Sequence, residues 1–304
     1  MAAVVEEGGS PKLSAEAFQL LYPEQFHQQF LDVQTRPDGR PLARARPTSI
    51  GAGFVSTAQG SALVKIGNTS MIAGAKLEVF TPTKEAPDEG AIEVTVELPP
   101  ICSASSRPGR PSEEAQSVAQ RVTDAIKSAK AFDLGQLCIS KSKAAWVVYL
   151  DVFCLSADGS LFDCTLLAAV GALANLALPK VELSPEGQVA VGAQLAKNDA
   201  SNMDVDSSGG NVIEGPGKLA LRNMPVALTC GLWKGKILAD PNADEEALMD
   251  AFVTVTMDSQ GSLLSVYKPG GVVGASDATV MDCVEMTRLR HKEVSQIMDG
   301  CLNR

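Results

Sequence analysis

Residues Trp146 to Leu173 read WVVYLDVFCLSADGSLFDCTLLAAVGAL, and this stretch decides the fold. Its first part, Trp146–Leu155, is apolar on both faces apart from Asp151, which is typical of a strand buried on both sides. An Asp158-Gly159 turn follows. The second part continues with few polar residues until Pro179, which predicts a helix buried between two layers.

The residues before this stretch predict further strands. Ala62–Ile66 and Met71–Val79 are expected to pair as an antiparallel hairpin across Gly67-Asn68-Thr69. Apolar and polar residues alternate from Ile92 to Leu98, as in a half-buried strand, and Pro99-Pro100 ends it. The first half of the chain is therefore expected to be largely sheet.

A helix is predicted between these strands and the central stretch. Ser112 is a suitable N-cap, because acids follow it in the first turn and apolar residues then recur at helical spacing from Ala115 to Ala129. A short strand is expected next, at Leu137–Ser140. The solvent-exposed face of the helix is expected to carry Arg121, Asp124, Lys127 and Ser128.

The same order of elements recurs after the buried helix. A closing helix is expected over Ser276–Cys301, and it contains the basic stretch from Arg288 to Lys292. Strands followed by helices, twice over, indicate an α+β fold. The strands predicted for this part, with a hairpin turn at Asp258–Gly261, are Met224–Trp233, Lys236–Ala239, Ala251–Met257 and Leu263–Tyr267.

Three other segments complete the division of the chain. Ser14–Leu31 has helical spacing interrupted by Pro23, which predicts a docking helix followed by a turn. The pentapeptide RPDGR, Arg36–Arg40, is a predicted turn, and Lys197–Lys218 is polar and rich in Gly and Asp, as in a loop or linker. We divide the chain into an N-terminal extension with the docking helix (1–32), a first half (33–196), a flexible acidic, Gly-rich insertion (197–218) and a second half with the C-terminal helix (219–304).

Composition excludes several classes of protein. The 304 residues are 45% hydrophobic and 20% charged, so the chain can bury a core and is not wholly disordered. The net charge of -10 argues against autonomous nucleic-acid binding through a dominant basic face. Seven scattered cysteines without a Cys-x-x-Cys pair indicate reduced thiols of an intracellular protein, mostly in the core. We expect no signal peptide, no transmembrane helix and no membrane partner.

Motifs for catalysis or metal binding are weak. His27 and His291 are the only histidines, and without a nucleophile elbow they are predicted to be ordinary surface or interface residues. A loop from Asp204 begins like an EF-hand, but Gly215 holds the place of the bidentate Glu, so we predict a solvated loop. No metal and no cofactor are predicted.

Two charged segments each leave two readings open. The four carboxylates in Asp240–Glu246 could hold Mg²⁺ against a phosphate substrate, or they could cap and begin a short helix, which the composition favours. Arg107 and Arg110 lie on an irregular loop suited to phosphate or RNA-backbone contacts, or they are charges of a surface loop.

Several segments together identify a family. RPDGR, GSALVKIGNTSMIAGAK (Gly60–Lys76) and the central stretch resemble the RNase PH family, and further segments resemble its ring subunits in the eukaryotic RNA exosome. The resemblance runs from about residue 15 to the end, apart from 197–218. It implies an RNase PH-like fold of two β-α-β halves, like domain 2 of ribosomal protein S5, six copies of which close into a ring around an RNA channel. The further segments are ELPPICS (97–103), RPGRPSEEA (107–115), ILADPNADEE (237–246) and YKPGG (267–271).

The chain departs from the active members of this family at the catalytic positions. Active members bind the attacking phosphate with a Gly-Gly-Thr-Arg-like turn, whereas the matching residues here are Gly159, Ser160 and, in place of the cation, the phosphate-repelling Asp163. Active members also carry two aspartates six residues apart. Asp240 fits the first, but Glu246 replaces the second. The resemblance therefore implies a degenerate phosphorolytic site.

The residues that would contact RNA also differ. Non-catalytic archaeal ring subunits hold RNA with two arginines four residues apart on the first helix, and these positions fall near Gln120 and Asp124 here. Arg121 and Lys127 lie on the same helix outside that register. The candidates for RNA contact are Arg107 and Arg110 first, then Arg121 and Lys127.

The resemblance thus implies a non-catalytic structural subunit of the exosome core ring that supports 3′-to-5′ RNA processing and degradation. Its implied partners are other RNase PH-like ring subunits, S1/KH-domain cap subunits, an associated hydrolytic exoribonuclease, and RNA through the assembled complex. Nucleus, nucleolus and cytoplasm are the implied locations. Two alternatives stay open, a phosphate-dependent 3′-to-5′ exoribonuclease whose site a neighbour completes, and an independent RNA-binding module, which the net charge disfavours.

Overall fold

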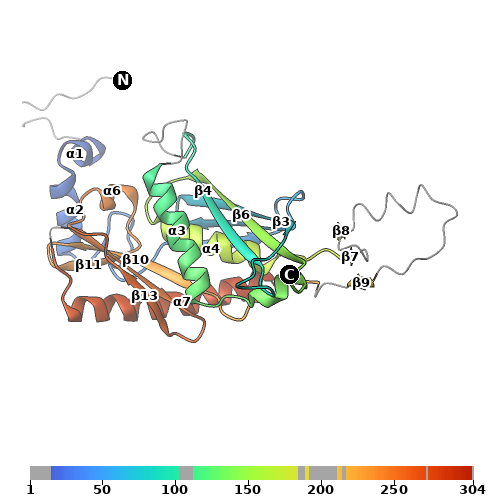
Figure 1. The fold of residues 1–304 in the computed structure, drawn as a ribbon. Coiled ribbons are helices and arrows are strands. Elements are labelled where there is room, and N and C mark those ends of the chain that lie inside the picture. Colours follow the sequence, from blue (N-terminus) through green and yellow to red (C-terminus); the bar gives the residue numbers. More distant parts are fainter. Residues whose placement is uncertain are drawn as a thin grey trace, which may run out of the picture.

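Two large β-sheets with helices packed between and beside them, and a small third sheet, make up the described part of the protein (Figure 1). The computed structural model describes residues 15–102, 112–183, 189–191, 211–213, 217–271 and 273–302. Arg107, Arg110 and the loop from Asp204 lie outside these residues. None of the helices in this described part is long and apolar enough to cross a membrane.

The first sheet confirms the strands expected before and within the central stretch. Its order is β1-β2-β3-β6-β4, in which β4 is parallel to β6 and the other pairs are antiparallel, and β5 also pairs with β6. The hairpin of β2 and β3 turns tightly, because Ile66 pairs with Thr69. The strand expected from Leu137 begins one residue later, since Leu137 ends a 3₁₀ helix, Leu134–Leu137. The strands are β1 (Thr48–Ala52), β2 (Gly60–Ile66), β3 (Thr69–Phe80), β4 (Ala91–Glu97), β5 (Cys138–Ser140) and β6 (Ala144–Ser156).

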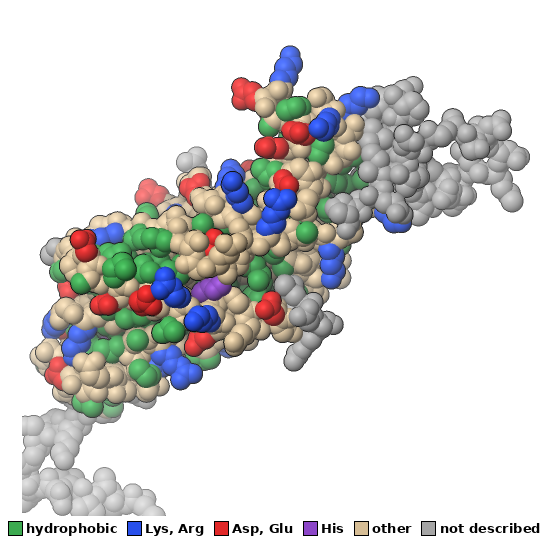
Figure 2. Space-filling model, turned by 90° about the horizontal axis from the view of Figure 1, so that it is seen from below, with side chains coloured by type: hydrophobic (Ala, Val, Ile, Leu, Met, Phe, Trp, Pro, Cys, Tyr) green, Lys and Arg blue, Asp and Glu red, His purple; other side chains and the backbone are tan. Residues whose placement is uncertain are grey.

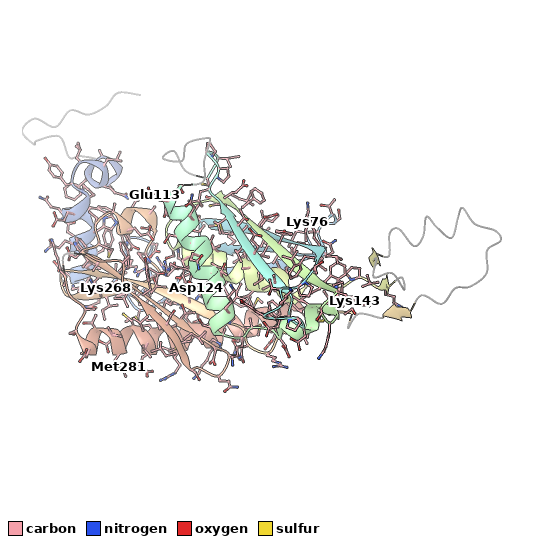
Figure 3. The ribbon with its side chains drawn as sticks, in the orientation of Figure 1. Lys76, Glu113, Asp124, Lys143, Lys268 and Met281 are labelled. Atoms are coloured by element: carbon pink, nitrogen blue, oxygen red, sulfur yellow. The ribbon has the colours of Figure 1, made fainter. Side chains whose placement is uncertain are left out.

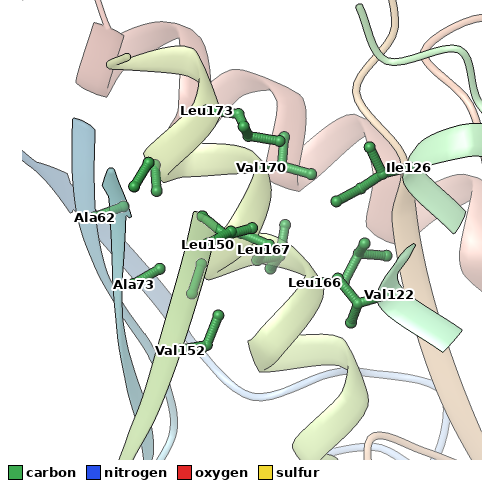
Figure 4. Packing of buried hydrophobic residues seen from close by; sticks show 14 of the residues in the cluster. Ala62, Ala73, Val122, Ile126, Leu150, Val152, Leu166, Leu167, Val170 and Leu173 are labelled. Carbon is green, nitrogen blue, oxygen red and sulfur yellow. The ribbon is translucent and has the colours of Figure 1, made fainter. Parts of the chain in front are cut away.

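Helix α4 (Leu161–Ala174) is the buried helix that the central stretch predicts. It packs against β2 and β3 on one side and contacts β10 of the second sheet on the other. Leu166, Leu167 and Leu173 are at most 2% exposed, and Figure 4 shows these side chains among those of the strands and of α3. Helix α3 (Glu113–Ser128) packs on α4 and β4, and the Ser112 side chain caps it by accepting the Ala115 N–H.

The second sheet has the order β11-β10-β12-β13, and all its pairs are antiparallel. Helix α7 (Asp277–Leu302) packs against β10, β11 and β12 and reaches β1 of the first sheet. These elements confirm the strands and the closing helix expected for the second half. The strands are β10 (Val226–Trp233), β11 (Lys236–Ala239), β12 (Ala251–Met257) and β13 (Leu263–Tyr267).

A small third sheet corrects one expectation. Strand β7 (Val181–Leu183) pairs with β8 (Val189–Val191) and with β9 (Asn211–Ile213). The prediction that 197–218 is entirely a loop or linker is wrong at β9, because apolar Val212 and Ile213 favour a strand. The other residues of that segment up to 216 lie outside the described part.

The N-terminal segment is two helices where one was predicted. Helix α1 (Ala15–Leu21) and helix α2 (Pro23–Asp32) meet at Tyr22. Pro23 begins α2, because a proline costs no hydrogen bond in the first turn of a helix. Lys234 and Lys236, at the turn between β10 and β11, bind α2 through an ion pair to Glu24 (Nζ–Oε1 2.7 Å) and a hydrogen bond to the Leu31 carbonyl.

Both histidines are buried within the chain. The prediction of surface or interface residues is therefore wrong for the surface, while a place at an interface stays a prediction. His27 is 4% exposed and His291 is 8% exposed. In the basic stretch of α7, Arg290 is also buried, at 6% exposed. Their burial was not predicted, because apolar periodicity alone does not indicate which polar side chains a packed helix covers. The seven cysteines are free thiols, and five of them are buried.

Candidate functional site

The loop before α4 meets the acidic segment 240–246 where the two sheets adjoin. Gly159 has a φ of +75°, and a Cβ atom there would lie 2.5 Å from the carbonyl oxygen of Pro241. Ser160 follows in the left-handed region and begins α4. The close approach thus requires glycine at position 159 and brings four predicted residues, Gly159, Ser160, Asp240 and Glu246, to one place.

Asp240 is neutralised by a buried arginine. Arg46 donates from Nη2 to Asp240 Oδ1 (2.6 Å) and from Nε to Oδ2 (2.9 Å), and its backbone N–H donates to Oδ2 (2.8 Å). Asp240 is 2% exposed and Arg46 is 5% exposed. Burial alone would raise the pKa of Asp240, but the hydrogen bonds and the charge of Arg46 outweigh it and lower this pKa below its usual value.

A second buried arginine holds the rest of the acidic segment. Arg36 is 0% exposed, donates to the carbonyl oxygens of Ala239 (2.6 Å) and Asp240 (3.2 Å), and lies 3.6 Å from Glu245 Oε2. Burial lowers the pKa of Arg36 to about 10. Glu245 also completes a capping box with Asn242 at helix α6 (Ala243–Glu246).

Of the two readings of this segment, the helix-capping one is therefore confirmed. Within the described part of the chain, no group of three or more His, Cys, Asp or Glu side chains is placed to hold a metal ion.

Glu246 binds the amide at the start of α4. The Ser160 N–H donates to Glu246 Oε1 at 2.7 Å, and the Ser160 hydroxyl approaches the Pro241 carbonyl at 3.3 Å. The first N–H groups of a helix have no partner within the helix and favour an anion. A carboxylate of the chain itself therefore takes the amide that a bound anion would use. Burial raises the pKa of Glu246 to about 7.

Asp163 turns away from this amide and links α4 to the second sheet. Its carboxylate accepts the Thr229 N–H (2.7 Å) and the Thr229 hydroxyl (3.0 Å), and the same hydroxyl lies 3.1 Å from that of Thr254. Burial raises the pKa of Asp163 to about 6, although the hydrogen bonds from Thr229 act in the opposite direction. Asp163 thus has a structural partner in β10.

Contrary to the prediction, Arg121 does not lie on the solvent-exposed face of α3. Its guanidinium lies between the rings of Phe162 and Tyr267, 3.9 Å from each ring centroid, and burial lowers its pKa. Arg121 also lines a cavity of about 310 Å³ together with Ser160 and Glu246. Glu114 and Glu246 oppose Arg121, the one cation among the described lining residues.

The other candidates for RNA contact lie elsewhere. Lys127 is exposed on α3 and does not line this cavity. Gln120 and Asp124 are exposed and hydrogen-bonded to each other (3.0 Å), and Figure 3 labels Asp124 on α3. Arg107 and Arg110, outside the described residues, stay predictions.

Three residues of the site were missed by sequence reasoning. Arg36 was taken as part of a turn and Thr229 as one position of a strand, and Arg46 was not singled out. Their partners, Asp240 and Asp163, lie far away in the sequence, so no local pattern indicates the pairing. The only indication of these partners was the general rule that a buried carboxylate must be paired or hydrogen-bonded.

Comparisons with known proteins agree on one family. The model of the 3′ exoribonuclease family (RNase PH), domain 1, matches residues 44–179, and that of domain 2 matches residues 223–288. "Exosome complex component Rrp42" of Methanopyrus kandleri is 32% identical over 267 residues, which are 88% of this chain and 92% of that protein. "Exosome complex component rrp43" of Schizosaccharomyces pombe is 31% identical over 272 residues, 89% of this chain and 93% of that protein.

Solved structures give the same result. The structure described as "archaeoglobus fulgidus exosome with RNA bound to the active site" superposes with a TM-score of 0.73 at 28% identity, covering 90% of this chain and 96% of that one. Rice Rrp46 shares the fold, with a TM-score of 0.61 at 19% identity over 88% of this chain and 100% of that one.

Proposed function

Because this chain belongs to the 3′ exoribonuclease (RNase PH) family, we propose that it is a non-catalytic structural subunit of the RNA exosome core ring. In this role it helps to form the RNA channel and the scaffold for an associated hydrolytic exoribonuclease. It thereby supports 3′-to-5′ RNA processing and degradation. Relatives named as exosome components, matched along nearly their whole length, support the proposal.

One observation carries the non-catalytic part of the proposal. Phosphorolysis needs a site for orthophosphate, and the Ser160 amide at the start of α4 is bound by Glu246. The carboxylates Glu114 and Glu246 line the same cavity, and Asp163 stands where active relatives are expected to carry a cation. A phosphate entering here would displace one carboxylate and be repelled by the others.

The partners we propose are other RNase PH-like ring subunits, S1/KH-domain cap subunits and the hydrolytic exoribonuclease. The outer edge of the second sheet supports contact with a neighbour. Strand β13 ends the sheet order and exposes Leu263 (51%), Val266 (42%) and Tyr267 (37%), and an open edge with apolar side chains favours association. Arg107, Arg110, Arg121 and Lys127 stay the proposed RNA contacts, and nucleus, nucleolus and cytoplasm the proposed locations.

Ring membership is tested by mixing the purified chain with candidate RNase PH-like partners and weighing the products by native mass spectrometry. We expect a six-subunit ring that contains this chain. The chain alone is expected to show no phosphate-dependent shortening of RNA. A chain that stays monomeric with every partner, or that shortens RNA alone, would contradict the proposal.

One observation favours the alternative, an exoribonuclease whose site a neighbour completes. Arg121 supplies a cation to the cavity that Ser160 and Glu246 line. Under this alternative the assembled ring would release nucleoside diphosphates from this site, because only phosphorolysis yields that product.

A further inference from the structure

A second cavity lies beside α7, on another part of the molecule from the site above. It measures about 530 Å³ and lies between α7 and the turn that joins β12 to β13. From α7 it is lined by Arg288, His291, Lys292 and Ser295, and from the turn by Ser259 and Gln260. On the face that Figure 2 presents, a histidine lies beside Lys and Arg side chains, with acidic side chains further out.

The lining of this cavity is basic in an acidic protein. Among the described residues that line it, none is acidic and none is Phe, Tyr or Trp. Arg288 pairs with Glu285, one turn away on α7, through Nη1 and Oε1 at 2.5 Å. Lys292 is exposed and forms no ion pair with any described residue. The net charge of -10 therefore does not describe this part of the surface.

His291 provides a buried nitrogen without a partner. The residue is 8% exposed, and Nε2 has no hydrogen-bond partner among the described residues. Burial lowers the pKa of His291, and the charged groups around it are Arg288 and Lys292 on α7 and Asp258 in the turn. The Asp258 carboxylate accepts the N–H groups of Gln260 (2.9 Å) and Ser262 (2.8 Å), so it belongs to the turn. His291 lines the cavity while its Nε2 stays closed to solvent, so the ring reports on a ligand in the cavity and is not counted among the groups that bind it.

We propose that this cavity binds a single phosphate monoester, the group carried by a phosphorylated serine or threonine of a partner protein. Two cations and several neutral donors match its charge of about -1.5 to -2 and its three acceptor oxygens. An RNA strand fits less well, because it needs several phosphate contacts against a net charge of -10. The cavity also has no Phe, Tyr or Trp among its described lining residues for a base to stack on.

The surface beside the cavity suits a polypeptide that bears the phosphate group. Met281 and Leu289 are 60% and 63% exposed on α7, and Figure 3 shows Met281 on that helix at the edge of the molecule. These apolar side chains would contact the residues that flank a phosphorylated side chain. The proposal is independent of ring membership, since it concerns the isolated chain.

The test uses the full chain, labelled with ¹³C and ¹⁵N in its two histidines, so that the ring signals of His291 and His27 are resolved by NMR. The probes are inorganic phosphate, the peptide Ala-Ala-phosphoSer-Ala-Ala, its unphosphorylated form and a hexauridylate. We expect phosphate and the phosphopeptide to shift the His291 signals in a saturable manner. The His27 signals are expected to stay in place, because His27 lies on α2, away from this cavity.

Variants then locate the site. Lys292→Ala and Arg288→Ala are each expected to weaken phosphopeptide binding by about tenfold, because each removes a charge-assisted hydrogen bond. Lys76→Ala, at an exposed lysine on β3 (Figure 3), is the matched control and should leave binding unchanged.

Three outcomes would overturn the proposal. The first is a His291 chemical shift that does not change with phosphate or phosphopeptide, or that changes equally with chloride at the same ionic strength. The second is unchanged phosphopeptide binding in both cavity variants. The third is tighter binding of the hexauridylate than of the phosphopeptide, which would make this a contact for RNA.

Discussion

At the scale of single residues, the site is a set of buried charges whose partners decide their roles. Asp240 pairs with Arg46 and Glu245 with Arg36, whereas among the described residues Glu246 has only the Ser160 amide at hydrogen-bond distance. Asp240 is therefore held ionised, whereas burial raises the pKa of Glu246 from 4.5 to about 7. Of Asp240 and Glu246, it is therefore Glu246 whose ionised form is destabilised in the folded protein.

The shifted pKa of Glu246 predicts a pH-dependent stability. A carboxyl whose pKa is higher in the folded state loses stability as pH rises from its unfolded pKa of 4.5 through its folded pKa of about 7. Glu246→Gln stays neutral and keeps an oxygen for the Ser160 N–H. Its free energy of unfolding relative to the wild type should therefore increase by about 2–3 kcal/mol between pH 5 and pH 8.

Urea unfolding at the two pH values measures this difference. Asp163, whose pKa is raised to about 6, is present in both proteins, so most of its own contribution cancels in the comparison, and what remains is its repulsion with Glu246. If Glu246→Gln changes the free energy of unfolding by the same amount at pH 5 and pH 8, Glu246 is not a carboxyl with a raised pKa.

The pair of Arg46 and Asp240 predicts a large coupling energy. Arg46→Ala leaves a buried carboxylate unpaired and should lower the free energy of unfolding by about 3–5 kcal/mol, and the double variant with Asp240→Ala should lose less than the two single losses together. The control is Arg222→Ala, whose ion pair with Asp133 is exposed at both ends and should contribute at most about 1 kcal/mol. Equal losses for Arg46→Ala and Arg222→Ala would contradict the structural role of Arg46.

At the scale of elements, the loop before α4 joins the two halves. Gly159 combines a φ of +75° with a Cβ position 2.5 Å from the Pro241 carbonyl, whereas Gly261, in the turn after β12, has a φ of +77° with open space around it. Gly261→Ala should cost about 1 kcal/mol for the backbone conformation alone. Gly159→Ala should cost clearly more, by about 2 kcal/mol or more, since its clash is with backbone. Thermal unfolding of both variants compares them, and equal losses would mean that the close approach is not needed.

Much at this scale could be predicted from the sequence. The hairpin of β2 and β3, the N-cap of α3 and the buried α4 each depend on local signals, namely a two-residue turn, a capping serine and continuous apolarity. Pro23 was taken as an interruption because sequence alone does not distinguish the first turn of a new helix from the middle of an old one. The boundaries 1–32, 33–196, 197–218 and 219–304 stay a prediction.

The site was harder to predict than the fold. The acidic segment was identified from its four carboxylates and the loop from Gly159 through a family resemblance, whereas their arginine partners were not identified. Arg36 begins a turn and Arg46 lies in irregular chain just before β1, both about 200 residues before Asp240, and a charged residue in such a segment is ordinarily exposed. Their burial follows from the packing of the two halves, which no local pattern contains.

At the scale of the whole molecule, the arrangement separates two surfaces with opposite character. The cavity near Glu246 is lined by two carboxylates and Arg121, and the cavity beside α7 is lined by two cations and no described carboxylate. On our proposals, the first no longer performs phosphorolysis and the second contacts a partner. A net charge of -10 is then compatible with RNA biology, because the ring as a whole, and not this subunit alone, holds the RNA.

The most direct test of the central claim is the release of nucleoside diphosphates by the assembled ring, supplied with orthophosphate and an RNA with a free 3′ end. Glu246→Gln in this chain, which is expected to fold well, provides the comparison. We predict that the rate of release, whatever the partner subunits contribute, is the same with the wild-type chain and with the variant. A release that depends on Glu246 while the ring stays intact would show that this subunit catalyses phosphorolysis.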